Sequence, residues 1–291
     1  MSLVDRPDLV VRSPDGTHIA AFHSGTPGGP GTPGGPGTPG TPPLLLVHGA
    51  AADHTTFRAL GPGLAPAFEL FALDRRGRGA SGDTPPYSIE REFEDVASVA
   101  EAVAAASGVD RVDVFGHSYG GRCALGAALL TDAIRRVVSY EGAPTPAGER
   151  YGDAALADEL ITLADAGQDA ALLERFMTRV VGMSPDELER YRADPVWPRR
   201  VAAAPTIARE LSVEAGADAG LERLGGVRQP VLQLLGSASL PAFGSATRAL
   251  DDRLADGRIV VIEGARHAAH HTHVDEVVAA VRTFLRPNQE P

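Results

Sequence analysis

One short run, residues 112–130, constrains the fold of this chain more than any other part of its 291 residues. It opens with the alternating, strand-like run Val112-Asp113-Val114-Phe115, passes through Gly116-His117-Ser118-Tyr119-Gly120, and continues into small, helix-forming residues. The two glycines of that turn let a strand and a helix pass closely on either side of it. The pattern therefore predicts a strand, a sharp turn and a helix, with the Ser118 hydroxyl lifted out of the turn at strained backbone angles.

Ser118 is a candidate nucleophile in this setting. The helix that begins behind it presents unpaired backbone N–H groups, which would stabilise negative charge forming beside the hydroxyl. A Gly-x-Ser-x-Gly run on its own occurs often by chance and can be a plain glycine turn. The preceding strand and the following helix supply the context that the catalytic motif requires.

Composition narrows the range of partners and chemistries. The formal net charge of −11 disfavours nucleic acid or an anionic membrane as a partner, because either needs a basic face. The chain contains no lysine, which removes Schiff-base and phosphate-loop lysine chemistry. We therefore expect a small-molecule substrate, no cofactor, and a monomer or homodimer.

The single cysteine, Cys123, cannot form an internal disulfide, and its neighbours predict that it is buried in the helix after Ser118. Residues 1–6 lack the apolar core of a signal peptide, and no stretch is long enough to span a bilayer. These features predict a cytoplasmic protein.

Short apolar strands alternate with helices from residue 44 onward. This alternation predicts an α/β fold with a mostly parallel central sheet covered by helices on both faces. Two further strands around the turn Ser13-Pro14-Asp15-Gly16 predict an opening β-hairpin. The expected parallel strands are residues 44–47, 70–73, 112–115, 137–140, 231–235 and 259–262, and the expected helices include 90–107, 245–254 and 274–284.

Two segments depart from this alternation. Residues 25–43 consist of Gly, Thr and Pro units that cannot bury apolar surface, so we expect a flexible loop rather than a proline-rich docking motif. Residues 145–228 lack strand patterns but carry helix signals, including the capping box that begins at Ser184. We expect them to form a helical cap over a core made of residues 1–144 and 229–291.

A serine nucleophile needs a base, and His267 is the candidate. The strand-like residues 258–262 are followed by Glu263-Gly264-Ala265-Arg266-His267, which places this histidine on a loop at the carboxyl edge of the last expected strand. That edge is the one at which Ser118 is expected. His267 could instead be an ordinary surface histidine. Its position at the same edge as the serine turn favours a catalytic role.

The chain resembles the α/β-hydrolase family over nearly its whole length. The matching pieces, in chain order, are His48-Gly49-Ala50-Ala51, Asp74-Arg75-Arg76-Gly77-Arg78-Gly79-Ala80-Ser81, the Gly-x-Ser-x-Gly turn and the late Gly-x-x-His. The resemblance implies Ser118 as nucleophile and His267 as general base and then acid. It also implies an oxyanion hole formed by the backbone N–H groups of Tyr119 and Ala50, with Asp74 and Arg76 holding neighbouring loops.

The acidic residue expected to orient His267 departs from the commonest family pattern. Relatives usually carry Asp in the loop after the strand equivalent to residues 231–235, but Gly236-Ser237-Ala238-Ser239-Leu240-Pro241 contains no carboxylate. Some members place the acid after the preceding strand, where this chain has Glu141. We therefore predict that Glu141 orients His267. The alternative is a structural role for Glu141 with a weaker Ser–His dyad; Asp251 and Asp252 are expected well inside the following helix.

The histidines His267, His270, His271 and His273 could suggest a metal site. They straddle a loop and a helix start without acidic or cysteine ligands, so we predict no metal there. We expect His270 and His271 to edge the mouth of the active site or the solvent.

Together these features predict a serine hydrolase that cleaves a small, largely apolar carboxylic ester or lactone through an acyl-enzyme. Amide, thioester and carbon–carbon bond hydrolysis remain open, as do a small-molecule receptor and a cofactor-free lyase or cyclase on the same fold. Serine at the turn argues against dehalogenase and epoxide hydrolase chemistry, which need a carboxylate. Candidate wall residues, each equally compatible with a core role, are Phe176, Met177, Met183, Trp197 and Ile207.

Overall fold

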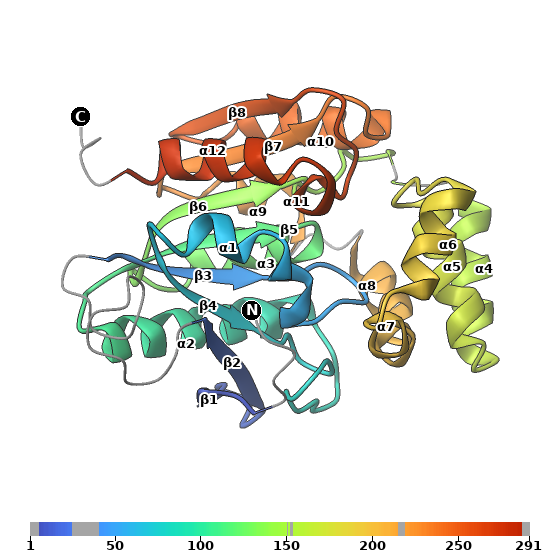
Figure 1. The fold of residues 1–291 in the computed structure, drawn as a ribbon, viewed down its shortest axis with the longest axis horizontal. Coiled ribbons are helices and arrows are strands. Elements are labelled where there is room, and N and C mark those ends of the chain that lie inside the picture. The colour runs from blue at the N-terminus through green and yellow to red at the C-terminus, as the bar shows by residue number, and fades with distance from the viewer. Residues whose placement is uncertain (1–5, 25–40, 150, 152–153, 215–218, 287–291) are drawn as a thin grey trace.

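The computed structural model of the protein describes residues 6–24, 41–149, 151, 154–214 and 219–286, and their strands form one sheet (Figure 1). The strand order is β1-β2-β4-β3-β5-β6-β7-β8. The first two strands are antiparallel to their neighbours, and the other six run parallel. The strands are β1 (Leu9–Arg12), β2 (His18–Ser24), β3 (Pro43–Val47), β4 (Glu69–Leu73), β5 (Val112–His117), β6 (Ile134–Tyr140), β7 (Val231–Gly236) and β8 (Gly257–Ile262).

Helices cover both faces of this sheet, as the alternating pattern predicts. On one face α2 (Ile89–Ser107), α3 (Tyr119–Ala128), α9 (Leu221–Leu224) and α10 (Pro241–Asp251) contribute to a large apolar core. On the other face η1 (His54–Arg58), α1 (Gly61–Leu64), α11 (Ala269–Thr272) and α12 (Val274–Phe284) build a second core. The predicted hairpin, parallel sheet and two helical layers are thus confirmed.

The helix α2 illustrates how local sequence sets these elements. Its N-cap, Ser88, accepts a hydrogen bond from the Arg91 N–H, and Glu90 and Glu92 lie in the first turn, where the helix dipole favours negative charge. The helix ends at Gly108, whose φ of 67° is the left-handed conformation that glycine adopts without a steric penalty.

Among the described residues between β6 and β7, five further helices lie beyond the carboxyl ends of the parallel strands (Figure 1). They are α4 (Ala154–Asp165), α5 (Asp169–Arg179), α6 (Pro185–Ala193), α7 (Trp197–Ala203) and α8 (Thr206–Glu214). The capping box at the start of α6 is present, with Ser184 and Glu187 exchanging hydrogen bonds. These helices share an apolar core of their own that also takes in Ala51 of the sheet domain, so they form the cap region.

Several boundaries differ from those expected from the sequence. Residues 25–40 of the expected flexible loop lie outside the described residues, and Pro43 already belongs to β3. Asp251 and Asp252 are not well inside a helix as expected, because α10 begins at Pro241 and ends at Asp251. Asp251 accepts a hydrogen bond from Gln233.

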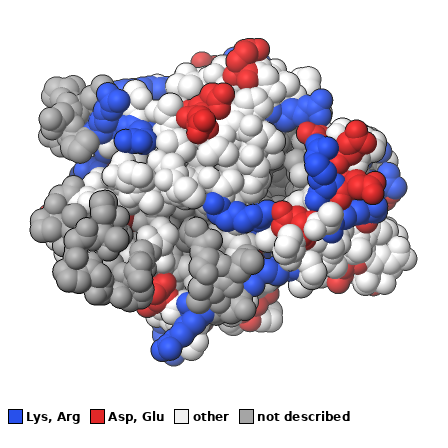
Figure 2. All heavy atoms as spheres, in the orientation of Figure 1, with Lys and Arg blue, Asp and Glu red and all other residues white. Residues whose placement is uncertain are grey.

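Charges of both signs are interspersed over the cap region on the face shown in Figure 2. Among the ion pairs of this region are Arg192–Glu174 and Arg175–Glu159. Within the described part of the chain, no helix is long and apolar enough to cross a membrane.

Gly120 provides a test of how closely α3 must approach β3. A Cβ atom there would overlap the carbonyl oxygens of Val47 and His48, which are backbone atoms and cannot swing aside. We expect Gly120→Ala to lower the free energy of unfolding by about 3 kcal/mol or more, measured by urea denaturation. Gly108→Ala is the control, since only open space surrounds that Cβ; it should cost about 1–2 kcal/mol from its positive φ. Equal losses for the two variants would contradict the close-approach argument.

Candidate active site

Ser118 occupies the turn between β5 and α3 in a conformation that L-residues rarely adopt. Its φ is 54° and its ψ is −126°. The turn is possible because Gly116 and Gly120 lack side chains: a Cβ at Gly116 would overlap the backbone of Gly120 and Gly121. The Ser118 N–H donates to the Tyr140 carbonyl across the sheet at 2.7 Å, which anchors the turn to β6. The expected strained serine turn is therefore present.

The register of the parallel strands brings Glu141 beside Ser118. His117 and Tyr140 are direct partners in the pairing of β5 with β6. Ser118 and Glu141, the residues that follow them, therefore lie near each other at the carboxyl edge of the sheet. Glu141 leaves β6 with a φ of 49°, and its N–H donates to the Leu234 carbonyl of β7. It thus lies between the loops that follow β5 and β7.

His267 joins these two side chains. The Ser118 hydroxyl lies 2.9 Å from His267 Nε2, and His267 Nδ1 lies 2.5 Å from Glu141 Oε2. The tautomer with its proton on Nδ1 donates to the carboxylate and accepts the serine proton at Nε2. The carboxylate is buried and the imidazole nearly so. The three residues singled out in the sequence therefore form one hydrogen-bonded chain.

The second oxygen of Glu141 has partners that the sequence did not reveal. Oε1 accepts hydrogen bonds from the Gly236 N–H at 2.8 Å and from the Ser239 hydroxyl at 2.6 Å. Both donors lie at the carboxyl end of β7 and in the loop after it, where relatives commonly carry their acid. The loop that lacks a carboxylate thus binds the carboxylate supplied by the neighbouring strand.

Two aromatic side chains of the sheet hold the His267 loop in place. The Tyr140 hydroxyl donates to the Arg266 carbonyl and accepts from the Ala269 N–H, so it spans the loop on both sides of His267. His117 Nε2 lies 2.8 Å from the His267 carbonyl oxygen. Sequence reasoning missed both roles, because nothing local to either residue indicates a contact about 130–150 residues away along the chain.

The expected oxyanion donors border the same space. Tyr119 is the first residue of α3, where a backbone N–H has no acceptor within the helix. Ala50 follows β3 in a loop that His48 fixes: His48 Nδ1 lies 2.8 Å from the Gly49 carbonyl, and Nε2 accepts from the Arg75 N–H at 3.0 Å. Burial, and then the charge of Arg75, lower the pKa of His48 well below its usual value, which keeps this ring neutral as that bonding requires.

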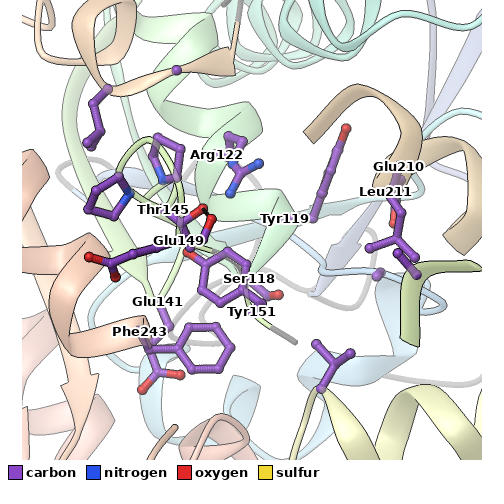
Figure 3. A pocket seen from close by; sticks show the side chains of 18 of the residues that line it. Ser118, Tyr119, Arg122, Glu141, Thr145, Glu149, Tyr151, Glu210, Leu211 and Phe243 are labelled. Carbon is purple, nitrogen blue, oxygen red and sulfur yellow. Dashed lines mark hydrogen bonds between the residues drawn. The ribbon is translucent and has the colours of Figure 1, made fainter. Parts of the chain in front are cut away.

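A cavity of about 660 Å³ opens beside Ser118, Glu141 and His267 (Figure 3). Its apolar wall comes largely from the cap region and α10, and Phe243 also stacks on the His267 ring at 4.3 Å between centroids. The lining includes Ala50, Tyr119, Leu156, Leu160, Phe176, Val180, Ile207, Leu211 and Phe243.

The expected wall residues thus divide into two groups. Phe176 and Ile207 line the cavity. Met177, Met183 and Trp197 are absent from its lining within the described residues, and they pack in the apolar core of the cap region instead. Their residue types are apolar, but the sequence could not show which side of each helix meets the cavity.

The remaining histidines have separate partners. His270 is buried against His117, with 4.0 Å between ring centroids, so the expectation that it edges the mouth or the solvent is wrong. His271 is exposed and shares a hydrogen bond with Thr56, and His273 shares one with Thr272. Burial raises the cost of charging His270 and lowers its pKa well below the usual value.

Asp74 and Arg76 are held in structural contacts. Asp74 accepts from the backbone N–H groups of His54 and Ala80. Arg76 forms a two-pronged pair with Asp95. These contacts fix the loops after β3 and β4 at the carboxyl edge of the sheet.

Comparison with known proteins identifies relatives of this chain. The family described as "Alpha/beta hydrolase family" matches residues 44–280. A pimeloyl-[acyl-carrier protein] methyl ester esterase of Xanthomonas campestris pv. campestris (strain B100) is 30% identical over 254 residues, which cover 84% of this chain and 95% of the relative.

Solved structures match over nearly the whole chain. An alpha/beta hydrolase from Sphaerobacter thermophilus DSM 20745 superposes with a TM-score of 0.73 at 30% identity, covering 94% of this chain and 99% of the other. The enol-lactonase from Burkholderia xenovorans LB400 shares the fold at 21% identity, with a TM-score of 0.74 and coverages of 95% and 99%. The family match over residues 44–280 and the 30% identical relative over 84% of the chain show that the chain belongs to the alpha/beta hydrolase family.

Proposed function

We propose that this protein is a serine hydrolase that cleaves a small, largely apolar carboxylic ester or lactone through an acyl-enzyme. The observation that carries the proposal is the hydrogen-bonded chain from Ser118 Oγ through His267 to Glu141 at the wall of a largely apolar cavity. A serine hydroxyl becomes nucleophilic when a base in this position takes its proton. The buried carboxylate stabilises the imidazolium that results.

In the first half of the reaction, Ser118 Oγ attacks the carbonyl carbon while His267 Nε2 takes the hydroxyl proton. The negative charge that develops on the carbonyl oxygen is stabilised by the N–H groups of Tyr119 and Ala50. His267 then donates its proton to the leaving alkoxide, and the bond between the carbonyl carbon and that oxygen breaks. The acyl group remains on Ser118.

In the second half, a water molecule replaces the alcohol. His267 takes a proton from this water, and the resulting hydroxide attacks the acyl carbon in the same oxyanion hole. Collapse of the intermediate releases the carboxylic acid and returns the proton to Ser118 Oγ. His267 and Glu141 act in both halves of the reaction from the same positions.

The cavity supports the choice of substrate class. Its volume of about 660 Å³ suits a ligand of moderate size, and side chains such as Leu160, Phe176 and Ile207 favour an apolar acyl group. The 30% identical relative is named as a methyl ester esterase, which supports an ester rather than an amide. A receptor on this fold would not need His267 held between a serine hydroxyl and a buried carboxylate, and that arrangement favours an enzyme.

Ser118→Ala should abolish ester turnover without unfolding the protein, because the hydroxyl lost from this turn contributes no core packing. Hydrolysis of p-nitrophenyl esters of graded chain length, together with lactones, gives the rate, and a fluorophosphonate probe followed by mass spectrometry locates the modified residue. We expect labelling of the wild type at Ser118 and none of the variant. More than a few per cent of the wild-type rate in the variant would exclude Ser118 as the nucleophile.

Glu141→Gln should lower kcat by about two to four orders of magnitude with little change in KM, since it keeps the shape but removes the charge that stabilises the imidazolium. Steady-state kinetics on an activated ester measures both constants. Near-normal activity of Glu141→Gln alongside an inactive His267→Ala would show that another group orients the histidine.

The contact between Ser239 and Glu141 allows a rescue experiment. Introducing Asp by Ser239→Asp in the Glu141→Gln background places a carboxylate in the loop where relatives commonly carry their acid. We expect partial recovery of kcat, with Ser237→Asp in the same background as the control because the Ser237 hydroxyl contacts the Gly264 N–H instead. Equal rates for the two double variants would argue against a shared role of positions 141 and 239.

A further inference from the structure

Phe243 lies flat against the imidazole ring of His267. The two ring centroids are 4.3 Å apart, and the ring planes differ by 21°. Phe243 belongs to the first turn of α10, and its side chain is buried. A stacked pair at this separation is in van der Waals contact, so Phe243 covers one face of the proposed general base.

A second aromatic contact keeps Phe243 in this position. The ring of Tyr151 lies beside it, with 4.6 Å between centroids and 32° between planes. The Tyr151 hydroxyl donates to the Ala143 carbonyl, which fixes Tyr151 in turn. Phe243 is therefore enclosed between two rings, and it cannot turn away from His267 without losing both contacts.

The segment that carries Phe243 also binds the acidic partner of His267. The Gly236 N–H and the Ser239 hydroxyl donate to Glu141 Oε1 at 2.8 Å and 2.6 Å. Phe243 follows them along the same segment, and Glu141 Oε2 lies 2.5 Å from His267 Nδ1. One stretch of chain thus contacts both the carboxylate and the face of the imidazole, which fixes these two groups relative to each other.

The face of the Phe243 ring has an electrostatic effect on the reaction. An aromatic ring carries partial negative charge on its faces, and it attracts a cation held over one of them within about 6 Å. In the proposed mechanism His267 becomes positively charged when it takes the Ser118 proton. The attraction to Phe243 therefore grows as the imidazolium forms. Because both rings are buried, water screens this attraction little.

The other rings that contact His267 in the described part of the chain are placed differently. His117 is tilted by 46° with 4.9 Å between centroids, and Tyr140 is tilted by 35° at 6.3 Å. His117 Nε2 donates to the His267 carbonyl, and burial lowers the pKa of His117 well below its usual value, so this neighbour stays neutral. Of these three rings, only Phe243 is stacked on the imidazole.

We propose that Phe243 is a positioning residue that acts through His267. Its ring holds the imidazole in line between Ser118 and Glu141, and the face of the ring stabilises the imidazolium. Phe243 then differs from a plain wall residue, because its contribution depends on the charge of His267 and not on the shape of the substrate. This inference rests on the proposed ester hydrolysis and adds a residue to its machinery.

Fluorinated phenylalanines at position 243 provide the first test. Site-specific incorporation of mono-, di- and trifluorophenylalanine withdraws negative charge from the ring face stepwise, with little change in shape. We expect kcat for p-nitrophenyl butanoate to fall at each step, by about three- to tenfold over the series, with little change in KM. Equal kcat values throughout the series would overturn the stabilisation of the imidazolium by Phe243.

The acyl chain of the ester separates this effect from contact with the substrate, because Phe243 also lines the cavity (Figure 3). The series is repeated with p-nitrophenyl acetate and p-nitrophenyl hexanoate. An effect that passes through His267 gives the same fold-loss for every ester, since each reaction uses the same base. A loss that grows with acyl length would assign Phe243 to the substrate wall and overturn its positioning role.

Phe176 provides the matched control. It is a buried phenylalanine that lines the same cavity, and its ring is not among those that contact His267 in the described residues. The same fluorinated series at Phe176 should leave kcat unchanged. A fall equal to that at Phe243 would show a general effect of fluorine in the cavity and would overturn the assignment.

Phe243→Leu removes the ring face and keeps an apolar side chain. We expect kcat to fall by about tenfold, with a much smaller change in KM. If this variant does not fold, the fluorinated series decides, because it preserves the shape of the ring. No ester turnover by the wild type, together with no fluorophosphonate labelling at Ser118, would overturn the proposed function itself and this inference with it.

Discussion

The active site depends on the backbone ladder that joins β5, β6 and β7. In a parallel sheet the strands end at the same edge, and the pairing of His117 with Tyr140 and of Tyr140 with Leu234 sets which residues lie together just beyond the strand ends. The Ser118 N–H bonds to the Tyr140 carbonyl, and the Glu141 N–H to the Leu234 carbonyl. A shift of one residue in either pair would separate Ser118, Glu141 and the loop that holds Glu141.

Backbone strain is concentrated at this edge. In the described part of the chain, the non-glycine residues with positive φ are Ala51, Ser118 and Glu141. Ala51 follows an expected oxyanion residue, and the other two are the proposed nucleophile and acid. Such conformations cost about 1–3 kcal/mol each and persist only where surrounding contacts enforce them. The sheet and its two apolar cores provide that support, and the strained turns expose the side chains that the chemistry needs.

The cap region is attached through ionic contacts as well as apolar ones. Arg199 and Arg200 of α7 pair with Asp53, and Glu210 of α8 pairs with Arg75. Burial acts to raise the pKa of Asp53, but Arg200 and the other donors outweigh it and hold that pKa well below its usual value. Removing one partner of such a pair leaves an uncompensated buried charge, so these contacts specify one seating of the cap over the cavity.

The sequence alone determined those features that depend on local pattern and chain order. Glycines beside Ser118, apolar strands at regular intervals and Gly-x-x-His before His267 were sufficient for the fold and for two residues of the candidate site, and the missing carboxylate after β7 pointed to Glu141. Only the tertiary structure decided what Ser239, Tyr140 and Glu210 contact, that His270 is buried, and that Met177 and Trp197 face the core of the cap region. Periodicity and turn chemistry act over a few neighbouring residues, whereas these contacts join segments far apart in the chain and depend on strand register and helix packing.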